Sequence, residues 1–408
     1  MSHFNLMKSH FILTILYYLK INDYLCVIKT GIKLRIGVNT RLLLKGKLEG
    51  IGYFQQQILF RMVKSHPQDE FVFFFDRKYD TDFVFAKNVI PVVIPLPARH
   101  PLLWVLYFDY LLPLYIKKYK IDIFFSPENY IPGNCKIPTV CTIHDLNFYH
   151  NGKYIGDNWH QRYFMKYFPL NARKSDKIIT VSNFSKDDIS SSFGIDKSDI
   201  EVVYNASNPV YSPKPEAINI SVKNRYTNGK DFFYFVGAIH RRKNLVNIFL
   251  SFDSFKRQTG SDAKLVIVGE RKWWTDDMEY TYNNMNSKND VVFTGRLEAE
   301  SVSNIASASL ALVFPSLFEG FGIPVIEAMA SGTAVITSNT TSLPEVAGDA
   351  ALLVNPYSVE EITAAMVKIY SSPALRQELA EKGLQRNKLF DWDNSSEKLW
   401  KILTDTKR

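Results

Sequence analysis

The chain has few cysteines. It contains three, Cys26, Cys135 and Cys141, and none of them form a C-x-x-C pair. An odd number of thiols without regular spacing argues against a disulfide framework and against a cysteine-ligated zinc site. We therefore expect a protein of a reducing compartment, the cytoplasm.

Long hydrophobic runs are also missing. The best apolar run near the start, FILTILYYL at residues 11–19, is too short to cross a bilayer as a helix. Polar and charged residues follow it, and no cleavage site of small residues stands close behind, which argues against a signal peptide. We expect residues 1–31 to be an N-terminal extension of uncertain order.

Acidic residues are outnumbered by basic ones. The net charge is +8, and the whole excess lies in residues 1–205, whereas residues 206–408 are balanced. A basic half attracts anionic substrates, anionic lipid or nucleic acid, although ordinary solvated lysines explain it equally well. Nucleic-acid binding would need basic and aromatic residues interleaved on one face. The charge alone does not show this, and we expect no nucleic-acid partner.

The length and the apolar pattern predict two α/β domains. The 408 residues exceed one ordinary core. Both halves alternate short apolar strands with amphipathic helices, which is typical of parallel sheets. The expected domains are residues 32–207 and 231–390, joined by a linker at 208–230 that holds three prolines. Residues 391–408 are expected to form a final helix. Two such Rossmann-like domains bind ligands in a cleft at the carboxyl ends of their strands.

The segment FPSLFEGFGIPVIEAMASG, at residues 314–332, carries the strongest chemical signal. After a strand, a glycine-rich turn is formed by Glu319, Gly320, Phe321 and Gly322. A helix then starts at Pro324, whose missing N–H costs nothing at that position. Glycines let backbone N–H groups approach a ligand, and a helix N-terminus favours phosphate. Glu327 in the first helical turn can accept hydrogen bonds from a ribose diol, or it only complements the helix dipole.

Three cations follow the first strand of the second half, in GAIHRRKNL at residues 237–245. Arg241, Arg242 and Lys243 stand where a diphosphate would meet them, since arginine offers a fork and lysine a point charge. A solvated basic turn is the alternative. Which arginine contacts phosphate stays open.

Two candidates lie in the first half. In KLEGIGYF, Gly50 and Gly52 can bring backbone N–H groups toward a phosphate or a sugar. The loop lacks the third glycine of a dinucleotide fingerprint and a suitably placed acidic residue, which argues against a dehydrogenase. In TIHDLNF, His144 and Asp145 stand at a strand end, although a capping or core histidine is an equal alternative.

The sequence EGFGIPVIEAMASG, with seven residues between its two glutamates, resembles the signature of retaining glycosyltransferases of family 4. The resemblance covers nearly the whole chain from about residue 33 and implies the GT-B fold, with two facing Rossmann-like domains and a last helix that crosses back to the first. It implies that Glu327 holds the ribose of the donor and that Glu319 faces the transferred sugar. The backbone of Phe321 and Gly322 is implied to lie beside that sugar.

Other segments extend the resemblance. Arg242 and Lys243 are implied to neutralise the diphosphate leaving group, and His144 to contact the donor sugar. The donor site implied is Glu327, Phe321, Gly322, Gly320, Gly50 and Gly52, and the catalytic set is Glu319, Arg242, Lys243 and His144. VVYNAS matches the family at Asn205 but has Ala206 where glycine is usual. TSLPEVAGDAALLVNP resembles mannosyltransferase-like members, and we interpret its Glu345 as structural.

These features predict a retaining hexosyltransferase. The donor is a GDP- or UDP-hexose, with GDP-mannose preferred because the loops resemble mannosyltransferases. The acceptor is a glycan or a lipid-linked sugar in the synthesis of cell-surface polysaccharide or lipopolysaccharide. No D-x-D motif stands at a strand end, so we expect no metal and no cofactor besides the nucleotide sugar. The alternatives are a nucleotide-sugar epimerase of the same fold and a non-catalytic nucleotide- or glycan-binding protein.

A membrane contact is a further expectation. The aromatic helix expected at 101–120 ends in Lys117, Lys118 and Lys120, a combination that favours docking on an anionic membrane surface. A core helix with a solvated tail is the simpler account. The expected location is the cytoplasm, with peripheral contact at the inner face of the membrane.

Overall fold

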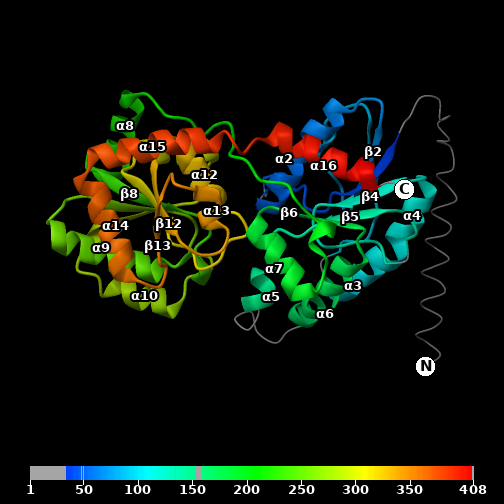
Figure 1. Ribbon diagram of the computed structural model, residues 1–408, viewed down its shortest axis with the longest axis horizontal. Helices are drawn as coiled ribbons and strands as arrows, with labels where there is room; N and C mark the ends of the chain where they lie inside the picture. The colour runs from blue at the N-terminus through cyan, green and yellow to red at the C-terminus, as the bar shows by residue number, and fades with distance from the viewer. Residues whose placement is uncertain are drawn as a thin grey trace.

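The computed structural model describes residues 34–406, apart from residues 47, 49, 99, 134 and 152–158. Two parallel sheets, each flanked by helices, form the right and left halves of an elongated molecule (Figure 1). The expected class, an α/β protein with two Rossmann-like domains, is confirmed. The extension at 1–31, with Cys26, lies outside the described residues. Cys135 is half-buried and Cys141 is buried, and both are free thiols.

The first domain is built on a seven-stranded sheet, as far as the described residues show, in the order β3-β2-β1-β4-β5-β6-β7. Its strands are β1 (Arg35–Asn39), β2 (Glu70–Phe75), β3 (Val89–Val93), β4 (Ile123–Ser126), β5 (Thr139–Thr142), β6 (Lys177–Thr180) and β7 (Ile200–Val202). Its helices are α2 (Gly50–Ser65), α3 (Pro101–Val105), α4 (Leu112–Lys118), α5 (Asn147–Asn151), α6 (Trp159–Lys174) and α7 (Asn183–Phe193). Strand β2 reads EFVFFF and is buried almost throughout, because helices cover both faces of a parallel sheet.

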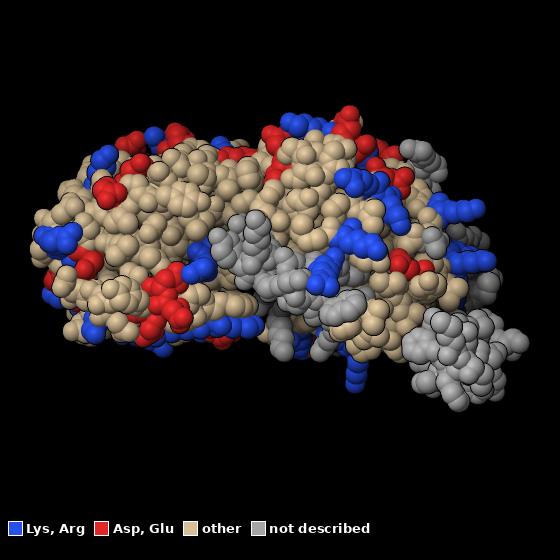
Figure 2. Space-filling view, turned by 90° about the horizontal axis from the view of Figure 1, so that it is seen from below, with Lys and Arg blue, Asp and Glu red and all other residues tan. Residues whose placement is uncertain are grey.

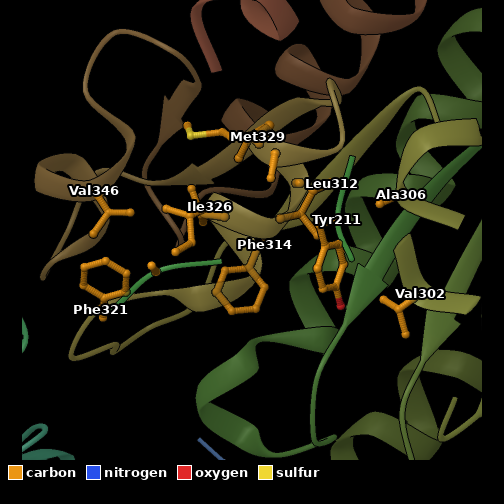
Figure 3. Packing of buried hydrophobic residues seen from close by; sticks show 14 of the residues in the cluster. Tyr211, Val302, Ala306, Leu312, Phe314, Phe321, Ile326, Met329 and Val346 are labelled. Carbon is orange, nitrogen blue, oxygen red and sulfur yellow. The ribbon is translucent and has the colours of Figure 1, made fainter. Parts of the chain in front are cut away.

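The second domain repeats this plan with six described strands in the order β10-β9-β8-β11-β12-β13. They are β8 (Phe232–Val236), β9 (Lys264–Val268), β10 (Val291–Gly295), β11 (Ala311–Phe314), β12 (Ala334–Ser338) and β13 (Leu352–Val354). The helices are α8 (Glu216–Thr227), α9 (Leu245–Thr259), α10 (Asp276–Asn283), α11 (Ala299–Ala308), α12 (Ile323–Ala330), α13 (Leu343–Ala347), α14 (Val359–Ser371) and α15 (Pro373–Asn387). Figure 3 shows Ile326 and Met329 of α12 with Leu312 and Phe314 of β11 in one apolar cluster.

The sheet topology determines where a ligand-binding site can lie. Strand order reverses between β1 and β4 in the first sheet and between β8 and β11 in the second. Loops on the two sides of such a point leave in opposite directions and open a crevice at the carboxyl ends of the strands. The loops after β1, β4 and β5 therefore provide one wall of a site, and the loops after β8 and β11 provide the other.

Part of the segment expected as a linker, residues 208–230, is helix α8, which packs on α11 of the second domain. Its buried residues are Val222 and Thr227, so the apolar pattern that marks a helix is weak here. The stretch before it is also tied to α11, because the backbone N–H of Lys214 donates to Ser307 Oγ at 2.8 Å. The flexible part of the connection is thus shorter than the sequence indicates.

The last helix, α16 (Trp392–Thr406), lies on α2 of the first domain (Figure 1). The Trp400 ring stacks on His66 with centroids 3.7 Å apart, and Ser396 Oγ donates to the Ile58 carbonyl at 3.1 Å. The chain therefore crosses between the domains twice, once before α8 and once before α16.

The helix expected at 101–120, with an interruption near Pro113, is α3, a π-helical stretch η2 (Leu106–Leu111) and α4. Pro113 stands in the first turn of α4, where the wider turn of η2 accommodates a residue that has no N–H. Within the described part of the chain, no helix is long and apolar enough to span a membrane.

Candidate active site

A cleft of about 960 Å³ lies between the two domains, bordered by the loops at both switch points. The residues proposed for the site from the sequence all line it. They are Gly50, Gly52, His144, Arg242, Lys243, Glu319, Gly320, Phe321, Gly322 and Glu327. Residues that are as much as 277 positions apart in the chain, Gly50 and Glu327, thus meet at one place, because both sheets direct their strand ends to it.

Glu319 forms a buried ion-pair cluster at the bottom of the cleft. Its Oε1 atom lies 2.6 Å from Arg242 Nη1 and 2.6 Å from Lys243 Nζ. Burial alone would raise the pKa of Glu319, but the charges of Lys243 and Arg242 outweigh it and lower the pKa to about 2. The carboxylate is therefore ionised at neutral pH, and both cations share its single charge.

The structure distinguishes the two arginines. Arg242 lines the cleft and donates from Nη1 to the Phe318 carbonyl at 2.9 Å, which aims its guanidinium at the loop of Glu319. Arg241 points elsewhere, with Nη2 3.1 Å from Asp277 Oδ2 and half of its side chain exposed. The short 3-10 helix η5 (Arg241–Lys243) turns these neighbouring side chains in different directions. Arg242 and Lys243 are thus the pair available to a phosphate in the cleft.

Two glycines of the turn are required by close packing. A Cβ atom on Gly320 would stand 2.3 Å from the His144 carbonyl oxygen of the other domain. Gly322 has φ +100°, a conformation that favours glycine, and it caps the N-terminus of α12. Phe321 between them is buried and packs against Phe390, with centroids 5.4 Å apart, so only its backbone is available to a ligand.

Glu327 faces the cleft from the second turn of α12 and not from the first turn expected from the sequence, because the helix begins at Ile323, one residue before Pro324. It is half-buried and lies among tyrosine rings, with a hydrogen bond from Tyr211. Burial raises the pKa of Glu327 to about 8, and the hydrogen bond from Tyr211 opposes this shift only weakly. In the ligand-free protein the carboxyl group is therefore mostly protonated at neutral pH.

The first domain contributes His144, Asp145 and the start of α2. His144 Nε2 lies 3.1 Å from the Pro127 carbonyl, which fixes the ring, and burial lowers the pKa of His144 to about 4. The histidine is thus neutral at pH 7 and serves as a hydrogen-bonding group and not as a charge. Gly50 and Gly52 lie in the first turn of α2, whose N–H groups have no partners within the helix, and both glycines line the same cleft.

Sequence reasoning missed a second group of cleft residues. Arg41 Nη2 pairs with Glu128 Oε2 at 2.6 Å, and Asn39 Nδ2 donates to Glu128 Oε1 at 2.8 Å. Aromatic side chains line the same side of the cleft: Trp104, Tyr130, Phe148, Phe164 and Phe168. Arg41 and Glu128 follow β1 and β4, so their places at strand ends were a usable signal. The convergence of the aromatic residues, which come from three helices and a loop, was not visible in the sequence.

Two buried polar atoms at the cleft have no hydrogen-bond partner in the described part of the chain. They are Thr142 Oγ1 and Asn205 Oδ1. Buried polar atoms without partners cost free energy unless a ligand or water satisfies them. Among the described residues, no three His, Cys, Asp or Glu side chains lie close enough together to bind a metal ion.

The raised pKa of Glu327 predicts that donor binding depends on pH. Ribose hydroxyls donate best to an ionised carboxylate, so binding must displace the proton that Glu327 carries below about pH 8. Affinity for the nucleotide sugar expected from the sequence, GDP-mannose, is predicted to increase by up to about tenfold from pH 6.5 to pH 7.5, the limit for one proton. Both phosphates of a nucleotide sugar are esterified, so the donor itself does not titrate in this range.

Calorimetric titration at the two pH values measures this effect. Glu327→Gln is the control, because it cannot ionise and should bind weakly with no rise. Equal affinity of the wild-type protein at both pH values would show that Glu327 does not accept the ribose hydroxyls as an anion.

Comparison with known proteins agrees with this geometry. Residues 217–386 match the family model described as Glycosyl transferases group 1, and residues 66–209 match the model described as Glycosyltransferase Family 4. The chain is 28% identical over 280 residues to O-antigen chain mannosyltransferase B of Escherichia coli, covering 68% of this chain and 73% of the relative. It is 29% identical over 292 residues to O-antigen chain mannosyltransferase RfbU of Salmonella typhimurium, covering 71% and 77%.

Solved structures share the fold. The sucrose-phosphate synthase of Thermosynechococcus elongatus superposes with a TM-score of 0.73 at 17% identity, covering 91% of this chain and 99% of that one. WaaG, a glycosyltransferase involved in lipopolysaccharide biosynthesis, gives 0.70 at 16%, covering 90% and 99%. HepE of Anabaena in complex with UDP-glucose gives 0.70 at 14%, covering 91% and 100%. At these identities the likeness establishes the arrangement of the two domains.

Proposed function

Because this chain belongs to the group 1 glycosyltransferases, with a first domain that matches family 4, we propose that it transfers mannose from GDP-mannose with retention at the anomeric carbon. The acceptor is a growing glycan or a lipid-linked sugar of lipopolysaccharide O-antigen. The names of the two mannosyltransferase relatives support the sugar and the pathway. The complex of HepE with UDP-glucose supports a nucleotide sugar as donor for this fold.

The proposal rests mainly on one structural observation. Arg242, Lys243 and Glu319 meet at the switch point of the second sheet, beside the N-terminus of α12 and facing the first domain. Two cations and a helix N-terminus are the features that bind a diphosphate and stabilise it as a leaving group. The neighbouring Glu327 suits a ribose, so the second domain offers places for both parts of a nucleoside diphosphate.

The reaction follows from this arrangement. The bond between the anomeric carbon and the diphosphate oxygen breaks, and Arg242 and Lys243 stabilise the charge that develops on that oxygen. The acceptor hydroxyl oxygen forms the new bond to the anomeric carbon on the same face, and its proton passes to the departing phosphate oxygen. Glu319 places a negative charge beside the sugar, which favours positive charge at the anomeric carbon.

The first domain offers a place for the acceptor. Its aromatic wall includes Trp104 and Phe148, and the flat apolar faces of pyranose rings pack well on such side chains. The Arg41–Glu128 pair and the Thr142 hydroxyl lie on the same side and can bond sugar hydroxyls. Since Arg41 is paired, this part of the cleft suits a neutral sugar.

A membrane contact remains part of the proposal. Leu102, Tyr110 and Leu114 of the α3–α4 segment are exposed, and Lys117 and Lys118 follow them on α4. Figure 2 shows lysine and arginine side chains projecting from the N-terminal half, on the right. Co-sedimentation with vesicles of anionic and of neutral lipid tests this part. Equal recovery with both kinds of vesicle would argue against it.

A screen of GDP- and UDP-sugars for slow hydrolysis and for transfer tests the function. We expect turnover of GDP-mannose above that of UDP-glucose and UDP-galactose, and NMR of the product should show the anomeric configuration retained. Preference for a UDP-sugar would contradict GDP-mannose as the donor but would be consistent with the transfer reaction. An epimerase would instead release a changed sugar without an acceptor. Absence of both turnover and binding for all of them would refute the donor site.

A further inference from the structure

One carboxylate makes four of the hydrogen bonds between the domains. Glu345 of α13, in the second domain, reaches the start of α7 in the first. Its Oε1 accepts from the backbone N–H and the side-chain Nδ2 of Asn183, each at 2.8 Å, and from Tyr204 Oη at 3.0 Å. Its Oε2 accepts from the Phe184 N–H at 3.0 Å.

These bonds have a clear physical basis. Helix α7 starts at Asn183, so the N–H groups of Asn183 and Phe184 are two of the four that a helix leaves without internal partners. The N-terminus of a helix also carries partial positive charge, which favours a carboxylate. The hydroxyl of Ser182 already caps α7 from within the first domain by accepting from the Ser185 N–H. Glu345 thus supplements the cap from the other domain.

The first turn of α7 also binds the loop that contains Glu319 and Gly320. Ser182 Oγ donates to the Gly320 carbonyl at 2.7 Å, and Ser185 Oγ donates to it at 3.2 Å. On its other side Gly320 lies directly against the His144 backbone, where it leaves no room for a Cβ atom. The position of α7 relative to the second domain therefore sets how closely Glu319 and its loop approach the wall that holds His144.

The backbone at Glu345 is held by hydrogen bonds from α15. Arg386 of α15 donates from Nη2 to the Glu345 carbonyl at 2.5 Å and from Nε to the Val346 carbonyl at 3.1 Å. The contact lies beside both crossing points of the chain, where Tyr204 and Phe390 meet edge to face with centroids 5.5 Å apart.

We propose that Glu345 is a positioning residue that sets the angle between the two domains. Through α7 it holds Gly320 and Glu319 against the wall of His144, and it is not among the described residues that line the cleft. The inference rests on the proposed function only in assuming that transfer takes place in this cleft.

The test compares Glu345→Ala with Ser358→Ala in the full chain. Ser358 caps α14 within the second domain by accepting from the Glu361 N–H at 3.1 Å, so its loss also removes a helix cap but crosses no interface. For Glu345→Ala we expect a kcat about ten- to a hundredfold lower with GDP-mannose and a donor KM within about twofold, because misplacement of reacting groups affects the rate more than binding. Ser358→Ala should keep both constants.

Small-angle X-ray scattering of the ligand-free variants gives a readout that needs no turnover. Glu345→Ala should scatter as a wider particle than the wild-type protein, and Ser358→Ala should match the wild type. Glu345→Gln keeps one carbonyl acceptor, so its kcat should lie between that of Glu345→Ala and that of the wild-type protein. Identical scattering of all variants would overturn the proposal, as would a Glu345→Ala variant with unchanged kcat. If the wild-type protein does not turn over GDP-mannose, the proposed donor fails, and the scattering alone decides on Glu345.

Discussion

Replacing Glu319 with glutamine is expected to lower the transfer rate by about a hundred- to a thousandfold, while GDP binds as tightly as before or more tightly. The carboxylate lies 2.6 Å from both Arg242 and Lys243 and shares its charge with them. When it becomes neutral, both cations are left entirely to the diphosphate, so product affinity should not fall. The negative charge that favours a positive anomeric carbon is lost at the same time, so the rate should fall.

Single-turnover kinetics with GDP-mannose and calorimetry with GDP measure the two effects separately. Glu300→Gln, at an exposed position on α11, serves as the matched control and should behave like the wild-type protein. Removing one partner of a buried ion pair destabilises a protein, by about 3–5 kcal/mol in other systems, so thermal unfolding must accompany the kinetics. A folded Glu319→Gln protein with normal turnover would rule out this role, and a strong loss of GDP affinity would show that Glu319 itself contacts the nucleotide.

Replacing Lys243 with methionine is expected to reduce kcat/KM by about a thousandfold, which corresponds to about 4 kcal/mol of lost transition-state stabilisation. The Lys243 ammonium is buried, with its Nζ 4.5 Å from the centre of the Phe314 ring, so water cannot replace it easily at a diphosphate. Methionine keeps the length and apolar contact of the stem and removes the charge, together with the bond from Lys243 Nζ to Glu319 Oε1. GDP affinity should fall as well, because the ground state also carries charge on its phosphates.

Arg241→Met is the matched control, since it also removes a cation from the same short helix. The Arg241 side chain is half exposed and pairs with Asp277, away from the cleft, so kcat/KM should stay within about threefold of the wild-type value. A large loss in Arg241→Met with little effect in Lys243→Met would reverse the assignment of the phosphate-binding cations.

Much of the fold could be predicted from the sequence alone. Strand β8, and strand β2 after Glu70, are unbroken apolar runs, and polar residues of the site such as Arg242 and Glu319 lie in the loops that follow strands. In a parallel sheet the carboxyl ends of the strands share one edge, so the positions of His144, Arg242 and Glu319 at strand ends already indicated a common site. The region of α8 was less readable, because few of its residues are buried and its helical pattern is weak.

Part of the site was decided by tertiary structure alone. The ion pairs of Glu319 with Lys243 and Arg242 join residues 76 and 77 positions apart, and the bonds of Glu345 to the start of α7 join residues 161 and 162 positions apart. No local pattern specifies such pairs, because they depend on how one domain packs against another and on how each side chain is turned. The same holds for the choice of Arg242 over Arg241, which are neighbours with the same chemistry.

The local pattern of this chain, with its strand ends, glycine turn and spaced glutamates, determined that it has two α/β domains and identified part of the residues that face the cleft between them. Those features follow from periodicity and from turn and helix-end chemistry, which act over a few residues. Only the tertiary structure decided which charges neutralise one another, which aromatic residues line the cleft and which carboxylate bonds the start of α7 across the two domains. These properties depend on burial and on distances between remote segments, and both arise only when the domains are packed.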